Sequence, residues 1–522
     1  MDIWQASIAV LGFDGSAWLV VPIFVPLVTA ILTYVIGNPS KNIASDWLGV
    51  AASAGVLIST CVIATSVWQT GVQSHAMGHW SPPLGISLRA DGLTCVMLLM
   101  SAMVGGFISI YAVGYFGQAA DFSKTTTAQR NINSSLFWPL WMLLWSALNG
   151  LFLSGDIFNL YVTLELMTLA AIGLIILAGT KMAVQASLRY LLVALAGSLF
   201  YLAGVTLLYG EYGTLDVVSL GQQVGVSDAS RTALLLMMIG LMLKTALFPF
   251  HFWLPPAHSS APAPVSALLS ALVVKASFYI LFRLWFDLFS PDVSLPFAML
   301  PATLGAAAIV WGGLQAINAD RLKTMVAYST VSQIGYLFLL FALIRHGSDE
   351  GFQTWCGGVL FAVSHAFAKA SLFLAAGVIM HVAGHDRIAD LSAAARQLPL
   401  TFFGIGLASI SLMGLPPTAS FVGKWMMIQA AIDCGLPVLA MVIVLGGLLA
   451  AVYLFRIIAA AFTPPMEATP EVALRPAPRL TEQAVIGLAI ISVLLGLASA
   501  PAFSLLAIGS PWDVPMVMEA DR

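Results

Sequence analysis

Long apolar stretches follow one another along almost the whole chain, and they constrain its fold more than any other feature. A helix needs about 20 mostly apolar residues to cross the hydrocarbon core of a membrane, and fourteen stretches are long enough. Of the 522 residues, 60% are hydrophobic and 9% are charged, whereas soluble proteins carry about 25% charged residues. We therefore predict an all-α polytopic membrane protein with about 14 transmembrane helices. The predicted spans are 18–37, 47–68, 92–116, 135–153, 157–178, 189–209, 231–250, 262–288, 297–318, 325–344, 355–381, 400–430, 436–461 and 483–508.

Two of these spans contain prolines that no continuous helix accommodates. The stretch Leu243–Lys275 holds five prolines, each of which lacks an N–H and clashes with the preceding helical turn. Gly414 and the two prolines that follow interrupt the twelfth span in the same way, ahead of Lys424. In lipid, broken backbone is tolerated only where protein or a water-filled cavity surrounds it. We expect broken helices 7 and 12, each beside a lysine, and such paired breaks point to transport sites.

Very few charged side chains fall inside the predicted spans. Of the 21 Lys and Arg residues, 17 are assigned to the two membrane sides and four lie within spans. An ionisable group at the bilayer centre costs at least about 2.5–3.5 kcal/mol, so these groups must be hydrated, paired or neutralised. Because burial favours their neutral forms, they suit a proton relay. The charged residues well inside spans are Lys244, Lys275, Lys369, Lys424 and Glu165.

Several of the ionisable residues in or near the spans also have a structural explanation. Glu165 could be a packing device that is bound permanently to one lysine. His365 alone is typical of a core histidine, but Lys369 follows one turn later on the same helical face, which makes the two a natural relay. We interpret Asp156 as a cap of the fifth helix, whose N-terminus favours an acid, with ion entry as the second interpretation.

No residue pattern indicates a cofactor, a metal or bond-making chemistry. The four cysteines are scattered without metal-binding spacing, and no nucleotide or haem motif occurs. The net charge of −3 gives no argument for nucleic acid. His251 and His258 flank the proline-rich turn near the surface, and we interpret both as structural, with a functional role as the alternative. The sequence therefore favours a transporter subunit, not an enzyme.

Basic residues on alternate sides of the spans predict the orientation. One side carries five and the other twelve, and the richer side is cytoplasmic by the positive-inside rule. Both termini are then outside, in a plasma or inner membrane. The poorer side holds Arg89, Arg231, Arg283, Arg345 and Arg522. The richer side holds Lys41, Lys124, Arg130, Lys181, Arg189, Arg321, Lys323, Arg387, Arg396, Arg456, Arg475 and Arg479.

Five ordered motifs between about residues 90 and 460 resemble the antiporter-like subunits shared by Mrp-type cation/proton antiporters, respiratory complex I and membrane-bound hydrogenases. The motifs are GDIFNLYVTLELM (155–167), LKTALFPFHFWLPPAHSSAPAPVSALLSALVVK (243–275), DRLKTMVAYSTVSQIGY (320–336), SHAFAKASLFLAAG (364–377) and SLMGLPPTASFVGKW (411–425). The residues of the first and last motifs are most similar to those of the D-type subunits of Mrp antiporters. The absence of a long C-terminal lateral helix from the sequence pattern favours the same subunit type.

The resemblance implies a domain organisation. It implies two inverted five-helix repeats, the first at 135–290 with helices 4–8 and the second at 291–461 with helices 9–13. Helices 1–3 precede them at 1–134, and a loop with helix 14 follows at 462–522.

The resemblance also assigns site residues. By position, the matches are Glu165 and Lys244 to a paired glutamate and lysine, Lys275 to a bridging basic residue, His365 to a histidine, and Lys424 to the lysine of the twelfth span. The run HAFAKA departs from the family's HAFFKA but keeps His365 and Lys369. The DRLK run offers Lys323, which we interpret as a charge at a helix–loop boundary, with a functional role as the weaker alternative.

The resemblance implies a proton-translocating subunit of a multisubunit Na+(K+)/H+ antiporter. Protons would move along a hydrated Lys/His/Glu axis at mid-membrane, and the partners would be further subunits of the assembly. The alternative is a proton-pumping membrane subunit of a complex I-like NADH-quinone oxidoreductase or a membrane-bound hydrogenase. A scaffold with permanently paired charges is a third possibility. The residues leave open which cation is exchanged and whether this subunit carries it.

Overall fold

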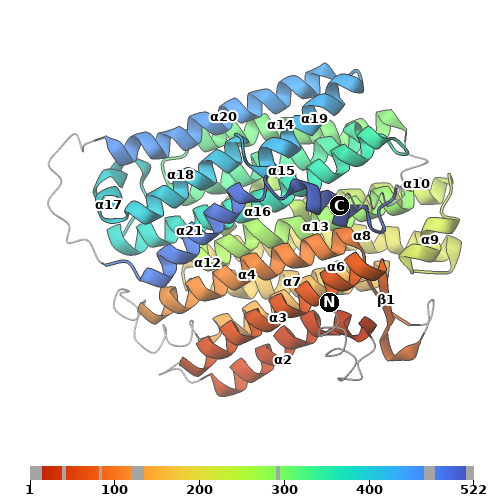
Figure 1. Cartoon of the computed structure of the whole chain (residues 1–522), viewed down its shortest axis with the longest axis horizontal. Helices are drawn as coiled ribbons and strands as arrows, with labels where there is room; N and C mark the ends of the chain where they lie inside the picture. Colours follow the sequence, from red (N-terminus) through yellow and green to blue (C-terminus); the bar gives the residue numbers. More distant parts are fainter. Residues whose placement is uncertain are drawn as a thin grey trace, which may run out of the picture.

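Long helices lying side by side make up nearly all of the protein (Figure 1). A computed structural model describes residues 15–37, 43–80, 85–118, 135–289, 294–463 and 476–512. The first half contains α2 (Val21–Ile36), α3 (Ile43–Thr70), α4 (Gly92–Gln118), α6 (Phe137–Leu153), α7 (Ile157–Ile176), α8 (Lys181–Tyr212), α9 (Val217–Gln223), α10 (Asp228–Thr245), η4 (Phe250–Trp253), α11 (Leu254–Ser260), α12 (Ala263–Leu268), η5 (Leu269–Val273), α13 (Val274–Arg283) and η6 (Leu284–Phe289). The second half contains α14 (Leu295–Asn318), α15 (Leu322–Leu343), α16 (Asp349–Ala383), η8 (Ile388–Asp390), α17 (Leu391–Gln397), α18 (Pro399–Met413), α19 (Ala419–Asp433), α20 (Pro437–Phe462), α21 (Arg479–Leu494) and α22 (Ser499–Ala507).

The number of membrane-spanning helices agrees with the sequence. Among the described residues, eleven helical spans are long and apolar enough to cross a membrane, and the bent pair α21–α22 makes a twelfth. The shorter apolar helices α6 and α18 complete the fourteen predicted crossings. The prediction of an all-helical polytopic membrane protein is therefore confirmed.

Several boundaries differ from the prediction. The seventh span continues through η4 and α11 to Ser260 instead of ending at residue 250, because prolines start new helical turns there. The last span bends by 75° between α21 and α22. The segment between the second and third predicted spans contains two short antiparallel strands, β1 (Gln73–Ala76) and β2 (Ser87–Ala90). Residues 464–475 of the proline-rich loop, both chain ends, and Lys41, Lys124, Arg130, Arg475 and Arg522 lie outside the described residues.

Both predicted helix breaks are present. The first ends α10 at Thr245, with Ala246 in the left-handed region at φ 58° and a cis Phe248–Pro249 bond just beyond. The second ends α18 at Gly414, with φ 80°, and a cis Pro416–Pro417 bond leads into α19. Each break exposes C-terminal carbonyl groups of a helix that have no partner within that helix.

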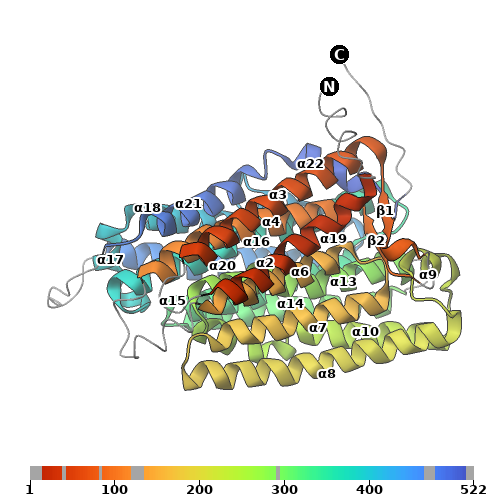
Figure 2. The ribbon, with the colours of Figure 1, turned by 90° about the horizontal axis from the view of Figure 1, so that it is seen from below.

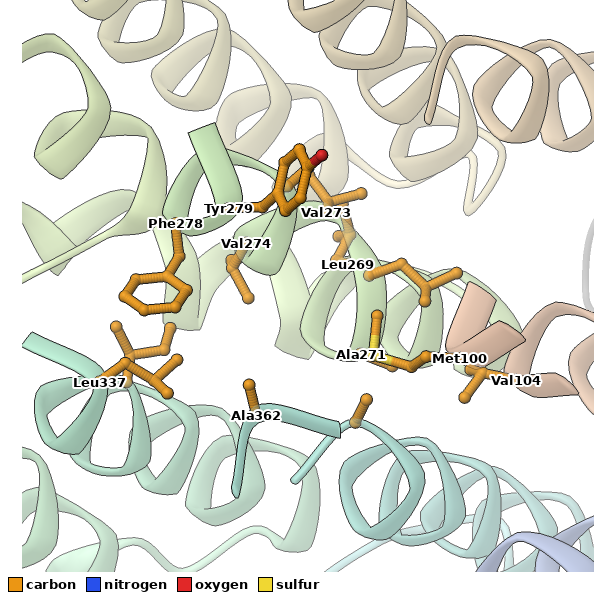
Figure 3. Close-up of a cluster of buried hydrophobic side chains, with 14 of the residues drawn as sticks. Met100, Val104, Leu269, Ala271, Val273, Val274, Phe278, Tyr279, Leu337 and Ala362 are labelled. Carbon is orange, nitrogen blue, oxygen red and sulfur yellow. The ribbon is translucent and has the colours of Figure 1, made fainter. Parts of the chain in front are cut away.

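The eighth span, α12 to η6, runs through the centre of the protein. All of its most apolar 18-residue window is buried, whereas only a third of the corresponding window of α20 is. A helix that is apolar on every side and buried belongs to a core. Figure 3 shows Leu269 and Phe278 of this span packed between Met100 of α4 and Leu337 of α15.

The connections at the two ends of the bundle agree with the predicted alternation of loops. The β1–β2 strand pair, which carries Arg89, and α9 lie at one end, and α17, which carries Arg396, lies at the other (Figure 1). Which end faces the cytoplasm stays a prediction from the basic residues.

Helix packing is similar in the two halves. Helix α6 packs on α7, and α8 packs along α10 (Figure 2), just as α14 packs on α15 and α16 packs on α18 and α19. This agrees with two five-helix repeats, although their boundaries stay a prediction.

Candidate functional site

Glu165 and Lys244 form an ion pair inside the helix bundle. The Lys244 Nζ lies 2.7 Å from the Glu165 Oε1 and also donates to the Thr168 hydroxyl at 3.2 Å. Ser198 donates a further hydrogen bond to the Glu165 carboxylate. The Lys244 side chain is 3% exposed and that of Glu165 is 18% exposed. The two residues that the resemblance pairs are therefore in contact, with two hydroxyl groups beside them.

Small residues bring the helices of this pair together. Gly197 of α8 faces Gly240 of α10, and a Cβ on Gly240 would clash with the Gly197 carbonyl oxygen. The close approach sets Lys244, one turn after Gly240, against α8. Because Lys244 lies in the last turn of α10, the negative end of that helix favours its charge.

Lys275 lies fully buried in the eighth span, just beyond a distortion of the helix. Residues Leu269–Val273 form a π-helical turn, a feature that often marks functional positions. The Lys275 Nζ donates to the Ser270 carbonyl oxygen of that turn at 2.8 Å. The Ser270 hydroxyl lies 2.9 Å from that of Thr330 on α15, which in turn donates to the Val326 carbonyl at 3.0 Å.

Lys369 meets the same carbonyl from the other side. Its Nζ donates to the Val326 oxygen at 3.0 Å and to the Ser329 hydroxyl. Polar groups of Ser270, Thr330 and Val326 therefore lie between Lys275 and Lys369, with a backbone carbonyl oxygen next to each lysine. His365, one turn before Lys369, is fully buried, and within the described residues neither of its ring nitrogens has a hydrogen-bond partner. It interacts electrostatically with Lys275, Lys369 and Lys424 together.

Lys424 occupies the second helix break. Its Nζ donates to the Leu412 and Met413 carbonyl oxygens, at 3.0 and 3.1 Å, which belong to the last turn of α18. The ammonium also lies 4.6 Å from the centre of the Tyr336 ring, within the range of a cation–π interaction. Phe361, whose ring lies parallel to that of His365, is 5.8 Å from the same Nζ.

The remaining sequence candidates lie apart from this axis or at its edge. Asp156 caps α7 by accepting from the Asn159 N–H at 2.7 Å, which agrees with the preferred interpretation. Burial raises the pKa of Asp156. His251 accepts a hydrogen bond from the Trp311 indole at 3.2 Å at the periphery. His258 is buried and stacks on Phe373, with ring centres 4.8 Å apart.

Lys323 differs from the sequence interpretation. The sequence suggests a charge at a helix–loop boundary, but Lys323 is 3% exposed, and its Nζ donates to the Ala261 carbonyl at 2.5 Å. Its charge acts on His258, as do those of Lys369 and Lys275. The start of α15 is covered by the proline-rich turn before α12, so a residue at a helix end is buried. Hydropathy does not show this covering.

Sequence reasoning also misses the neutral groups of the site. Ser198, Thr168, Ser270, Thr330 and Ser329 do not stand out, because Ser and Thr are common in membrane helices. Most of them lie on a different helix from the lysine that they approach. Their role therefore becomes visible only when it is known which helices touch.

The site consists of buried amines, one carboxylate, an imidazole and oxygen groups. Within the part of the chain that the structure describes, no three His, Cys, Asp or Glu side chains are grouped to hold a metal ion. Such a set can pass protons, because ammonium groups donate them and neutral amines accept them.

The chain is similar to known proteins along most of its length. Residues 154–450, more than half of the chain, match the family described as NADH:quinone oxidoreductase/Mrp antiporter, TM, and residues 81–124 match the N-terminus of chain 5 of complex I. The chain is 33% identical to the N-type subunit of the NADH-quinone oxidoreductase of Desulforudis audaxviator, over 85% of each protein. It is 28% identical to the D-type subunit of the Na(+)/H(+) antiporter of Bacillus subtilis, over 96% of each.

Solved structures place the fold in the same group. A chain of the Mrp complex from Dietzia sp. superposes with a TM-score of 0.82 at 25% identity, covering 95% of this chain and 98% of that one. A chain of the membrane-bound sulfane sulfur reductase, an archaeal respiratory complex, gives a TM-score of 0.82 at 26% identity, covering 94% and 96%. The chain therefore belongs to the NADH:quinone oxidoreductase/Mrp antiporter transmembrane family, in which it is similar to the D-type subunits of the Mrp antiporters.

Proposed function

We propose that the protein is the proton-translocating, D-type subunit of a multisubunit Na+(K+)/H+ antiporter in the plasma or inner membrane. The observation that carries this proposal is the Glu165–Lys244 ion pair at a helix break, followed by the buried groups of Lys275, Lys369, His365 and Lys424. Ionisable groups inside membrane helices are rare and costly, and they commonly mark ion pathways and proton relays.

The ion pair acts as a switch in this proposal. While Lys244 binds Glu165, its charge is compensated by the carboxylate. When the pair opens, the ammonium of Lys244 is uncompensated, and in a medium of low polarity its field reaches Lys275. A proton on Lys275 then costs more, and it moves towards Lys369.

The groups between the lysines supply the path. The Ser270 and Thr330 hydroxyls can accept one proton and release another, and they lie between the backbone carbonyls that Lys275 and Lys369 bind. Because a carbonyl oxygen cannot pass a proton on, water must connect each amine to these hydroxyls. Neither ring nitrogen of His365 has a hydrogen-bond partner among the described residues, and the ring interacts electrostatically with three lysines. His365 is the group that can accept a proton from Lys369 and pass it towards Lys424. Lys424 is then the terminal exchange site.

The partners follow from the relatives. The similar chains belong to an Mrp complex and to an archaeal respiratory membrane complex, and we infer that this subunit also works beside further membrane subunits. In such an antiporter, proton entry down its gradient drives export of sodium or potassium through the assembly.

One observation favours a second function. The relative from the NADH-quinone oxidoreductase is more similar in sequence than the antiporter relative is, although it covers less of the chain. In a redox-driven complex the same residues would pump protons outward. Purification of the intact assembly separates the two, because a quinone-reducing or hydrogenase partner co-purifies in one case and small antiporter subunits do in the other.

Proton-coupled sodium exchange in everted vesicles tests the proposal. Glu165→Ala and Lys244→Ala should each abolish proton-coupled sodium transport while the complex still assembles. Glu211→Ala and Lys181→Ala, at exposed positions of α8, are the matched controls and should transport normally. Normal sodium exchange in either Glu165→Ala or Lys244→Ala would show that the ion pair is not the switch.

A further inference from the structure

A second buried charge cluster lies on the same helix as Lys275, towards the end of the bundle that carries β2. The eighth span places Lys275, Tyr279, Arg283 and Asp287 four residues apart, so they follow one face of the helix. Asp91, just before α4, joins them from a neighbouring segment. Neither Asp91 nor Arg283 stands out in the sequence, because both fall at the predicted ends of spans.

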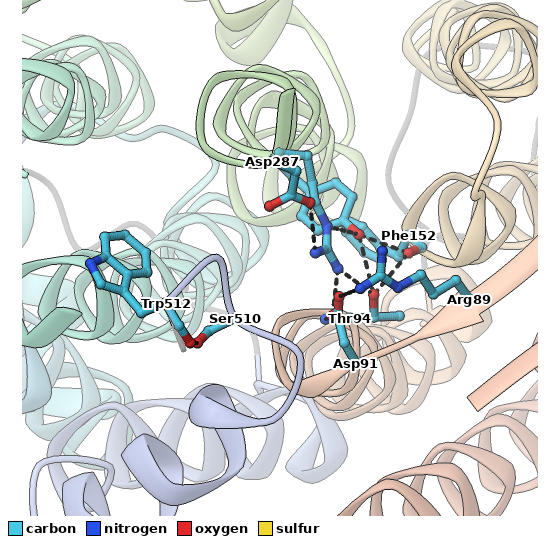
Figure 4. Close-up of polar contacts among 9 residues, drawn as sticks. Arg89, Asp91, Thr94, Phe152, Asp287, Ser510 and Trp512 are labelled. Carbon is cyan, nitrogen blue, oxygen red and sulfur yellow. Dashed lines mark hydrogen bonds and ion pairs between the residues drawn. The ribbon is translucent and has the colours of Figure 1, made fainter. Parts of the chain in front are cut away.

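Arg283 connects two carboxylates in this cluster. Its guanidinium lies 2.5 Å from the Asp91 Oδ1 and 3.2 Å from an Asp287 oxygen, and it donates to the Tyr279 hydroxyl at 3.1 Å (Figure 4). Thr94 completes the contacts, because its hydroxyl is 2.8 Å from Arg283 and 3.3 Å from that of Tyr279. The Tyr279 hydroxyl also donates to the Phe152 carbonyl at 2.8 Å, and the Asp91 Oδ1 accepts from the Thr94 backbone N–H at 3.0 Å, so Thr94 connects Tyr279 with Asp91.

Asp91 has an unused oxygen. The residue is 1% exposed, yet its Oδ2 has no hydrogen-bond partner among the described residues, and Arg89 approaches it only to 3.9 Å. Although burial by itself raises the pKa of Asp91, the charge and hydrogen bond of Arg283 outweigh it and hold that pKa below its usual range. The carboxylate is thus ionised while Arg283 binds it, and it can accept a proton once that contact is released.

The surroundings leave room for little more than water. A cavity of about 20 Å³ is lined by Thr94, Tyr279, Arg283 and Asp287, and a single water needs roughly 10–15 Å³. The segment after α22 covers the cluster, since the Gly92 N–H donates to the Ile508 carbonyl at 2.8 Å. A cavity of this size, with a few polar groups in a mainly apolar lining, suits the passage of protons better than that of a hydrated cation.

We propose that Asp91, with Tyr279 and Arg283, forms a proton-exchange site through which Lys275 communicates with the side of the membrane that carries Arg89, predicted to be the outside. This proposal rests on the proposed function. A Lys275 ammonium gives up one proton and becomes a neutral amine. The proton passes over the Tyr279 and Thr94 hydroxyls, with water between Lys275 and Tyr279 and between Thr94 and Asp91, and neutralises the Asp91 carboxylate. For this step Arg283 turns away from Asp91 towards Asp287, because an ion-paired carboxylate binds a proton poorly. When Arg283 returns to Asp91, the carboxyl group releases the proton outward.

The test uses the complete assembly in proteoliposomes, with the proton flux measured while the pH on each face is varied separately. Asp91→Asn removes the accepting carboxylate, and its flux should fall about 100-fold, the range that a positioned proton-transfer group contributes. Tyr279→Phe should lower the flux several-fold and weaken its dependence on outer pH more than on inner pH. Asp91→Glu should recover part of the flux.

Two matched controls identify general damage. Tyr111→Phe removes another buried hydroxyl that donates to a backbone carbonyl, at 3.1 Å, and Asp228→Asn removes an exposed acid at the start of α10. Both should behave like the unmodified protein. If Asp91→Asn fails to assemble, Tyr279→Phe decides, since it keeps every charge.

Glu165→Gln separates the two proposals. If Glu165→Gln is inactive while Tyr279→Phe and Asp91→Asn conduct normally from both faces, the proton-exchange site is wrong and the proposed function stands. If Glu165→Gln also conducts normally, the proposed function itself fails.

Discussion

The two broken helices hold their lysines in opposite ways. At the first break Lys244 is bound to a carboxylate, Glu165, with hydroxyl groups around it. At the second break Lys424 is bound by two backbone carbonyls and lies over an aromatic ring. Among the described residues, no acidic side chain forms an ion pair with Lys424. The first lysine is thus held by charge and the second by neutral dipoles.

This difference suggests different tasks. A lysine in an ion pair keeps its charge while the pair is closed and exerts a new field when the pair opens, which suits a switch. A lysine among neutral groups can lose its proton without leaving a carboxylate unpaired, which suits a terminal exchange site. The comparison indicates that similar helix breaks can have different tasks. In one half the break holds the switch that controls proton transfer, and in the other it holds the site that releases the proton.

The largest effect is expected for Lys244→Met. Loss of one partner leaves the Glu165 carboxylate uncompensated, which should lower stability by up to about 3 kcal/mol and abolish transport. The double variant Glu165→Gln/Lys244→Met should recover most of the stability and none of the transport. Thermal unfolding of the purified assembly and sodium efflux measure the two effects. Equal stability of the single and double variants would mean that the pair is not coupled.

Lys424→Arg should separate charge from proton release. A guanidinium keeps its proton in proteins but can still donate to the carbonyls of Leu412 and Met413. The assembly should remain intact while transport falls by about 10-fold or more. Lys181→Arg at an exposed position is the control for the substitution. Full transport by Lys424→Arg would show that this lysine holds the helix break and does not exchange protons.

Substitution of the small residues beside each lysine should have a moderate effect in both halves. A Cβ on Gly240 would clash with the Gly197 carbonyl, and one on Gly423 would clash with that of Gly357. Each Gly→Ala change should therefore cost about 1–3 kcal/mol, measured by thermal unfolding. Gly406→Ala, where a Cβ meets nothing within 4 Å, should be neutral. If only one half is sensitive, the close helix crossing is not a shared requirement.

The smallest effects are expected at the helix caps. Asp156 caps α7 and Thr418 caps α19 through side-chain hydrogen bonds to backbone N–H groups. Replacement of either by Ala should cost about 1 kcal/mol. Asp156→Ala should leave the exchange rate unchanged, whereas Thr418→Ala also loosens the second break and should slow exchange modestly. A strong transport defect in Asp156→Ala would instead favour its role in ion entry.

Sequence patterns predict the fold well because hydropathy and proline act locally. Fourteen apolar stretches and two proline-containing breaks are visible without tertiary information. The 75° bend of the last span and the burial of Lys323 are not visible in the sequence, because they depend on which segments cover one another.

The candidate site is predictable to a similar degree. Lysines and a glutamate inside apolar stretches are conspicuous, and Glu165 and Lys244 indeed touch. The hydroxyls and carbonyls that complete the path, such as those of Ser198 and Thr330, are not predictable. They act through contacts between helices far apart in the chain, and their residue types carry no signal of their own. The roles of the charged residues stay predictions until transport is measured.

Proton flux through the reconstituted assembly carrying Lys275→Met tests the central claim most directly. The proposed function makes Lys275 the link between the ion pair and the other buried lysines, and Met keeps a similar volume while it removes the amine. The account predicts an assembled complex in which proton flux and cation exchange are lost together. Flux at the level of the unmodified protein would contradict a proton path through the buried lysines.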